Sequence, residues 1–198
     1  MIFYKIYDKL NKIISTLWMR LILLLLGIKS NKSIFIGLCR FNLAPKTQIL
    51  LGDNCEFRSS STSNLIGINR PCIVSTLQED AKLCIGNNCG FSGTVIGCFK
   101  DIKIGNNVRC GANSLITDSD WHNDDYRSGA CKSIIIEDNV WIGEGAKIMK
   151  GVHIGKNSVI GAGSIVTSDI PANVIAAGIP CKVVKPLHCQ SQDFYQSN

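Results

Sequence analysis

An aliphatic residue returns at every sixth position through 36 residues of this chain, at Ile136, Ile142, Ile148, Ile154, Ile160 and Val166. A small or branched residue follows each of them by four positions, at Val140, Ala146, Val152, Ser158, Ser164 and Ile170. A period of six matches neither the roughly 3.6 residues of a helical turn nor the period of about 2 of an ordinary strand, so it indicates stacked repeats. We therefore predict an all-β domain, a parallel β-helix of about six coils in which each hexad forms one side.

One corner sequence recurs between these hexads, an aliphatic residue followed by Gly or Glu, a polar residue, Asn and a small residue. It starts at Leu51, Ile85, Ile104, Ile136 and Ile154. Gly and Asn suit such a corner because they accept positive φ or bond to the local backbone. The starts are 34, 19, 32 and 18 residues apart. Since three hexads make an 18-residue coil, we interpret 34 as about two coils, 19 as one coil with a bulge and 18 as one coil.

The separation of 32 residues leaves about fourteen more than one coil needs. These extra residues must leave the wall as a loop, which we place at residues 117–133. Loops on rigid scaffolds carry function more often than the scaffold does. This one contains the run Asp118-Ser-Asp-Trp-His122 and, a few residues later, Tyr126-Arg127.

The composition fits one compact domain. The 198 residues are 45% hydrophobic and 18% charged, and the net charge is +6. Nine of the 21 lysines and arginines lie in the first 58 residues, which suits an anionic membrane surface. No basic stripe with interleaved aromatic residues points to nucleic acid. Several of the ten cysteines fill inward repeat positions, and no metal-ligand spacing appears, so we expect a reduced cytoplasmic protein without a bound metal.

Residues 1–29 form a different kind of segment, for which we predict one helix. An apolar heptad stripe runs along it through Phe3, Tyr7, Leu10, Ile14, Leu17, Leu21, Leu24 and Ile28. Arg20 interrupts the apolar run, which is then too short to span a bilayer. Two positions for the stripe stay open: against protein, either the body or a second copy, or in the membrane interface. Residues 30–50 are expected to be a transition to the coils.

At three blocks the sequence resembles the hexapeptide-repeat acyltransferases, and among them the sugar O-acetyltransferases of bacterial surface polysaccharide synthesis. The blocks are Thr117-Asp-Ser-Asp-Trp-His122, Val140-Trp-Ile-Gly-Glu-Gly-Ala146 with Ile160-Gly-Ala-Gly-Ser164, and Asp169-Ile-Pro-Ala-Asn-Val-Ile-Ala-Ala-Gly-Ile-Pro-Cys-Lys182. The resemblance covers roughly residues 50–186. It implies a left-handed coil, acetyl-CoA as acetyl donor, and a homotrimer whose sites lie between subunits.

Acetyl transfer to a sugar hydroxyl needs a base, because a neutral alcohol attacks a thioester poorly. Histidine suits that task near neutral pH, and only His122 of the three histidines lies in the predicted loop. Either Asp120 or Asp118 could hold its imidazole. The resemblance makes His122 the catalytic base of a direct transfer; a solvated loop histidine is the alternative. His153 is expected to face solvent.

The resemblance also assigns binding residues. The donor would contact Trp141, Gly143, Glu144, Ala146, Ala162, Thr167, Gly178, Lys182 and Lys185. The acceptor would contact Ser92, Asn113, Trp121 and Tyr126, for which plain wall or anchor roles are the alternative. The predicted layout is a helix at 1–29, a transition at 30–50, a left-handed β-helix at 51–171, and a CoA-side segment with a short tail at 172–198.

The predicted function is acetyl-CoA-dependent O-acetylation of a surface polysaccharide or its precursor, the acceptor being a sugar or lipid-linked glycan. Three alternatives stay open: N-acetylation of a nucleotide-linked amino sugar, acetylation of a xenobiotic, and a non-catalytic trimeric binding module. The expected location is the cytoplasm, either free or at the inner face of the membrane through residues 1–28.

Overall fold

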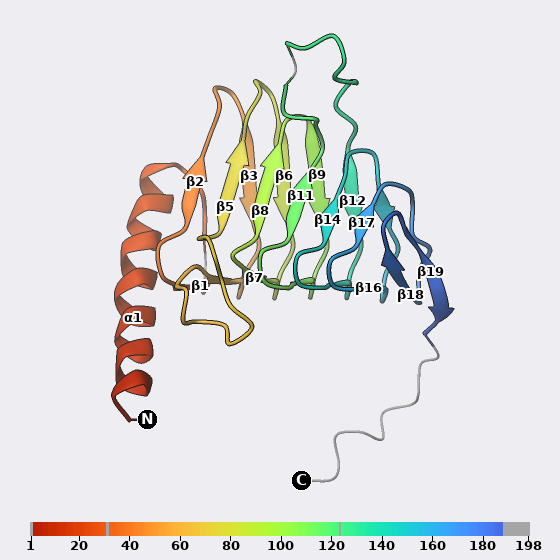
Figure 1. Ribbon diagram of the computed structural model, residues 1–198. Helices are drawn as coiled ribbons and strands as arrows, with labels where there is room; N and C mark the ends of the chain where they lie inside the picture. The colour runs from red at the N-terminus through yellow and green to blue at the C-terminus, as the bar shows by residue number, and fades with distance from the viewer. Residues whose placement is uncertain (1, 31, 123, 188–198) are drawn as a thin grey trace.

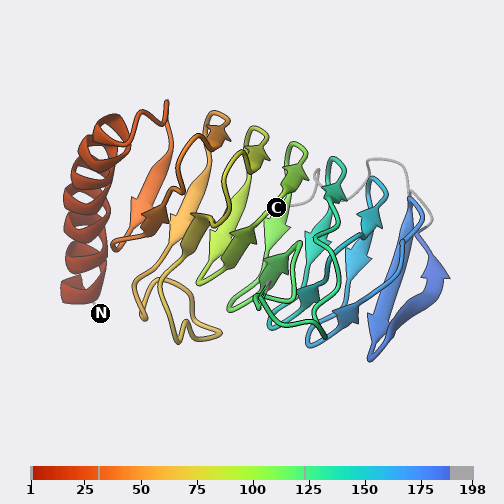
Figure 2. The same ribbon diagram turned by 90° about the horizontal axis from the view of Figure 1, so that it is seen from above.

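The computed structural model describes residues 2–30, 32–122 and 124–187. It contains helix α1 (Ile2–Leu25) followed by three sheets that form the walls of a left-handed parallel β-helix, as predicted (Figures 1 and 2). The first sheet, sheet A, has the order β1 (Ile34–Ile36), β4 (Glu56–Arg58), β7 (Gly90–Ser92), β10 (Arg109–Cys110), β13 (Trp141–Ile142), β16 (Val159–Ile160), β18 (Val174–Gly178) and β19 (Cys181–Pro186).

The other two walls complete each coil. Sheet B contains β2 (Arg40–Asn42), β5 (Ile73–Thr76), β8 (Val95–Cys98), β11 (Leu115–Thr117), β14 (Lys147–Ile148) and β17 (Ile165–Val166). Sheet C contains β3 (Gln48–Leu51), β6 (Lys82–Ile85), β9 (Asp101–Ile104), β12 (Ile134–Ile136) and β15 (His153–Ile154). All strand pairs are parallel except β18 with β19, which form a closing antiparallel hairpin.

The hexads explain the core. In-register pairing places the inward residue of each strand directly on its counterpart in the next coil, so Phe35, Phe57 and Phe91 form one column in sheet A. Their rings stack with centroids 5.1 and 5.0 Å apart. In the later coils Ile142 and Ile160 continue the column. The core is thus a set of aliphatic and aromatic columns along the helix axis.

The coils begin earlier than the corner sequences indicate. Residues 30–50, expected to be a transition, contain β1, β2 and β3, which pair with β4, β5 and β6 and form the first coil. The corner at Leu51 marks the end of a coil and not the start of the first one, because each corner follows the sheet C strand.

The interpretation of the 34-residue separation is also wrong. Leu51 pairs directly with Ile85, so a single coil lies between them. Its extra length forms a loop of residues 59–72 between β4 and β5, which we call the 59–72 loop. The second long loop, residues 118–133, connects β11 to β12. Figure 1 shows the two loops leaving opposite sides of the β-helix, the first below and the second above.

Six asparagines form a ladder along one corner, between sheets C and A. They are Asn54, Asn88, Asn107, Asn139, Asn157 and Asn173, and each has φ between 57° and 61°. Each of the first five donates from Nδ2 to Oδ1 of the next, over 2.8–3.3 Å. Asparagine tolerates this left-handed conformation better than most residues, and its amide bonds to a copy of itself in the next coil.

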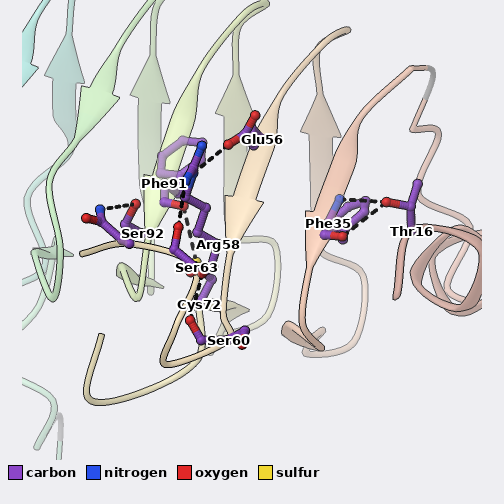
Figure 3. Close-up of polar contacts among 10 residues, drawn as sticks. Thr16, Phe35, Glu56, Arg58, Ser60, Ser63, Cys72, Phe91 and Ser92 are labelled. Carbon is purple, nitrogen blue, oxygen red and sulfur yellow. Dashed lines mark hydrogen bonds and ion pairs between the residues drawn. The ribbon is translucent and has the colours of Figure 1, made fainter. Parts of the chain in front are cut away.

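Helix α1 lies across the first coil, and it contacts the coil with a polar face. Thr16 Oγ1 accepts the backbone N–H of Phe35 at 3.0 Å (Figure 3). Ser15 Oγ donates to the carbonyl of Phe35 at 2.8 Å. Met19 and Leu23 are buried beside them. The heptad stripe from Tyr7 to Leu24 therefore does not face the body, because the free backbone groups of β1 require polar partners, whereas Ile28 at its end joins the core. Within the described residues, no helix is long and apolar enough to cross a membrane.

Candidate active site

Asp118 fixes the base of the 118–133 loop. Its buried carboxylate accepts the backbone N–H groups of Phe99, Lys100 and Asp101 at 2.7, 2.8 and 2.8 Å. Its own carbonyl accepts the N–H of Lys132, so the two ends of the loop meet at this residue. The sequence allowed Asp118 to hold the imidazole of His122, but the structure commits both of its carboxylate oxygens to the turn after β8.

Asp120 is engaged as well. Its Oδ2 accepts the N–H of Gly129 at 3.0 Å and pairs with the ammonium of Lys150 on the wall. The hydrogen bonds from Lys150 and Gly129 lower the pKa of this carboxyl from its usual value. Asp120 therefore ties the loop through Oδ2 to Lys150, just after β14.

The remaining predicted loop residues differ in exposure. Trp121 adopts φ 71° and packs its ring edge-on against Phe99, with centroids 5.4 Å apart, which makes it an anchor of the loop. Tyr126 is 95% exposed beside the guanidinium of Arg127. His122 is exposed, and in the described part of the chain its imidazole has no hydrogen-bond partner. The loop is held firmly on both sides while it presents an exposed imidazole.

Four of the nine predicted donor residues line a groove of about 870 Å³ on the outer face of sheet A. Those that line it are Trp141, Gly143, Glu144 and Ala162. Ala146 is buried at the next corner, whereas Thr167, Gly178, Lys182 and Lys185 are exposed toward the C-terminal end and do not line this groove. The groove is thus lined by the predicted donor residues of β13, β16 and the corners beside them, whereas Lys182 and Lys185 lie beyond one end of it.

Both predicted wall residues of the acceptor site contact the 59–72 loop. Asn64 Nδ2 donates to Ser92 Oγ at 3.1 Å, where Ser92 lines the groove. Asn113 accepts the N–H of Asn69 at 3.0 Å and donates to the carbonyl of Gly67 at 3.0 Å. Ser92 and Asn113 therefore lie together under one loop at the other end of the groove. Trp121 and Tyr126 lie in the 118–133 loop, away from this pair.

Three further charged residues line the groove and were not predicted from the sequence: Glu56, Arg58 and Arg109. Arg58 Nε donates to Glu56 Oε1 at 2.6 Å, and its Nη1 donates to the carbonyl of Ser63, so it also holds the 59–72 loop (Figure 3). Glu56 and Arg58 are outward residues of β4, and Arg109 is the outward residue of β10. The 34-residue separation between two corners could have indicated these residues, because as a single coil it requires a loop directly after Arg58.

The groove and His122 belong to different sides of one chain. The groove lies on sheet A, whereas the 118–133 loop leaves the corner between sheets B and C, on the opposite side in Figure 1. A smaller cavity of about 480 Å³ lies between this loop and residues 78–81. His153 is exposed, as expected, and pairs with Glu137 Oε1 at 2.8 Å. The described residues contain no group of three or more His, Cys, Asp and Glu that could hold a metal.

Comparisons with known proteins agree with this architecture. The sequence profile of the family "Bacterial transferase hexapeptide (six repeats)" matches residues 133–168. The galactoside O-acetyltransferase of Escherichia coli is 42% identical over 121 residues, which cover 58% of this chain and 59% of that protein. The enzyme of the same name from Lactococcus lactis is 48% identical over 93 residues, 44% of each chain. The chain thus matches less than two thirds of the length of either relative.

Among solved structures, AntD, an N-acyltransferase from Bacillus cereus in complex with dTDP and 3-hydroxybutyryl-CoA, has a TM-score of 0.60. It is 16% identical, and the alignment covers 81% of this chain and 83% of AntD, so the likeness concerns the fold alone. Together with the six observed coils and their period, these matches identify the repeat. Residues 133–168 of this chain therefore carry hexapeptide repeats similar to those of the bacterial transferase hexapeptide family.

Proposed function

We propose that this protein transfers the acetyl group of acetyl-CoA to a sugar hydroxyl, with His122 as the general base. The observation that carries the proposal is the exposed imidazole on a loop that Asp118 and Asp120 anchor. The relatives named galactoside O-acetyltransferase support the reaction class. That the acceptor is a surface polysaccharide remains a prediction from the sequence alone.

The reaction requires one base and one donor site. A nitrogen of His122 takes the proton of the sugar hydroxyl while the oxygen attacks the thioester carbonyl carbon. The carbon–sulfur bond then breaks, and the imidazolium returns the proton to the CoA thiolate. Backbone N–H groups at the site would stabilise the oxyanion. The apolar wall of the groove beside Trp141 and Ala162 suits the pantetheine arm of the donor, and exposed Lys182 and Lys185 suit its phosphates.

Within one chain, His122 and the groove lie on different sides of the β-helix. We therefore infer that the site forms between copies, with His122 of one subunit facing the groove of its neighbour. A homotrimer accounts for this arrangement with three equivalent sites. The 59–72 loop would then border the acceptor side of each site, next to Ser92 and Asn113.

The test is acetyl-CoA turnover, followed as CoA thiol release, with galactosides, maltose, amino sugars and a sugar-free control. We expect release with a hydroxyl acceptor, and a loss of about 10³-fold or more in His122→Ala, since a general base contributes on the order of 10²–10⁴. The matched control is His153→Ala, which removes another exposed histidine and should leave the rate unchanged. A preference for amino sugars would favour N-acetylation, and failure to bind CoA would favour a binding module.

A further inference from the structure

The outer face of α1 is apolar from Ile6 to Leu25. Ten large apolar side chains are exposed there, each by 47% or more: Ile6, Tyr7, Leu10, Ile13, Ile14, Leu17, Trp18, Leu21, Leu24 and Leu25. At about 100° per residue they occupy one continuous arc of roughly 140° on the helix. A contiguous apolar surface of this size on a soluble domain marks an interaction site.

The helix cannot turn this face inward. Ser15 and Thr16 bond to the backbone of Phe35, and Ser15 Oγ also accepts the N–H of Gly37 at 3.1 Å. Met19 and Leu23, on the same side, close the end of the hydrophobic core. Figures 1 and 2 show α1 lying along the end of the β-helix with its opposite side clear of every coil. The apolar arc therefore points away from the body.

The charge around this face is almost all positive. Residues 1–33 contain six lysines and arginines and one acidic residue, so they carry five of the six net positive charges of the chain. Lys9 and Arg20 are exposed at one border of the apolar arc, and Lys29 and Lys32 are exposed just after the helix. Two such helices packed face to face would bring basic borders together without acidic partners.

We propose that the outer face of α1 binds an anionic lipid surface, with the apolar arc in the membrane interface and the basic residues at the headgroups. An amphipathic helix with this division of apolar and basic residues lies in the interface plane without spanning it. Each basic residue near an anionic surface adds attraction that falls off within a Debye length. This binding is independent of acetyl transfer, and it would hold the β-helix with the first coil nearest the lipid.

The experiment is vesicle flotation of the full chain. One set of vesicles is phosphatidylcholine alone, and the other is phosphatidylcholine mixed with phosphatidylglycerol. We expect binding to the mixed vesicles, weaker binding to the neutral ones, and a decrease with added salt. Trp18 lies in the apolar arc, so its fluorescence should shift to shorter wavelength on binding, and Trp18→Phe should remove that shift.

Two variants test the face itself. Ile14→Glu combined with Leu17→Glu places two charges in the arc and should weaken partitioning at least about tenfold, since each lost aliphatic burial is worth roughly that factor. Leu50→Glu makes the same change at an exposed leucine of β3 and should bind as the parent does. Circular dichroism and thermal melting establish that each variant is folded.

The proposal is overturned if the parent chain does not float with anionic vesicles, or if the double variant floats as well as the parent. A second result would also overturn it: the parent chain does not bind vesicles but forms a concentration-dependent assembly in sedimentation, and the double variant does not form that assembly. That result would assign the face to a second copy.

Discussion

At the scale of the residue, Asp118 and Asp120 make contacts that their positions in the sequence do not predict. Both lie within four residues of His122, and the sequence made either one a candidate partner of the imidazole. Asp118 instead gathers three backbone N–H groups from the turn after β8, and Asp120 pairs with Lys150. Sequence distance predicts proximity, but it cannot say which way a carboxylate points when the neighbouring turn offers unpaired donors.

Removing the Asp118 carboxylate should lower the stability of the fold more directly than it affects the transfer reaction. Asp118→Ala leaves three N–H donors without their acceptor, one of them buried and two partly buried, so we expect the free energy of unfolding to fall by about 3 kcal/mol, measured by urea denaturation. Asp118→Asn keeps one acceptor oxygen and should lose less. The exposed Asp120→Asn serves as control, with a loss of about 1 kcal/mol or less. Equal stability of Asp118→Ala and the parent would refute this role.

At the scale of the element, the corners define the coils and the loops define the site. The six-asparagine ladder repeats one left-handed residue per coil, and the sequence displays this repeat openly. The 59–72 loop was overlooked because 34 residues are close to two 18-residue coils. Its Ser- and Asn-rich sequence is typical of a loop rather than of a wall, and would have distinguished the two interpretations.

The middle of the ladder offers a test that separates conformation from hydrogen bonding. Asn107 donates to Asn139 and accepts from Asn88, and its φ is 57°. Asn107→Ala should destabilise the chain by about 2 kcal/mol, because it loses both bonds and forces alanine into the left-handed region. Asn107→Gly removes the bonds but accepts the φ, so its loss in thermal or urea unfolding should be clearly smaller. Identical losses would mean that backbone conformation contributes nothing.

The 59–72 loop should set acceptor affinity if the proposed function holds. Asn64→Ala removes the hydrogen bond to Ser92 Oγ, so we expect KM for the acceptor to rise by roughly 3- to 10-fold while KM for acetyl-CoA stays constant, as one lost hydrogen bond implies. Leu65→Ala changes the adjacent, fully exposed side chain and is the matched control. A rise in both KM values would assign the loop to general stability.

At the scale of the whole molecule, the sequence predicted the regular part well and the irregular part poorly. Period six fixes which side chains point inward, so the coils and the buried columns agree with expectation, and the left hand agrees with what the family resemblance implied. The orientation of α1 does not follow from its heptad stripe. The backbone groups of β1 need hydrogen-bond partners, and α1 supplies them with Ser15 and Thr16 instead of burying its apolar face. Whether groove and imidazole meet depends on a second copy, which periodicity within one chain cannot describe.

Co-expression tests the shared site directly. His122→Ala lacks the base, and Ala162→Phe is designed to fill the groove, so each variant alone should be inactive. If the site forms between copies, mixed assemblies contain some sites with an intact base from one subunit and an intact groove from the other, and activity returns. If each chain holds a complete site, no mixture of the two recovers activity. Sedimentation of the parent checks the trimer.

The hydrogen bonds between α1 and β1 also limit how long this β-helix can become. A stack of parallel coils ends in strands whose backbone groups can pair with any further strand, including the end of another molecule, and repeated pairing of that kind builds fibres. Ser15 and Thr16 occupy those groups at the first strand, and β19, with Lys182 and Lys185, closes the other end of sheet A. At the first coil α1 therefore occupies backbone groups that a strand of another molecule would need, and at the other end of sheet A the two lysines of β19 oppose such pairing by their charge.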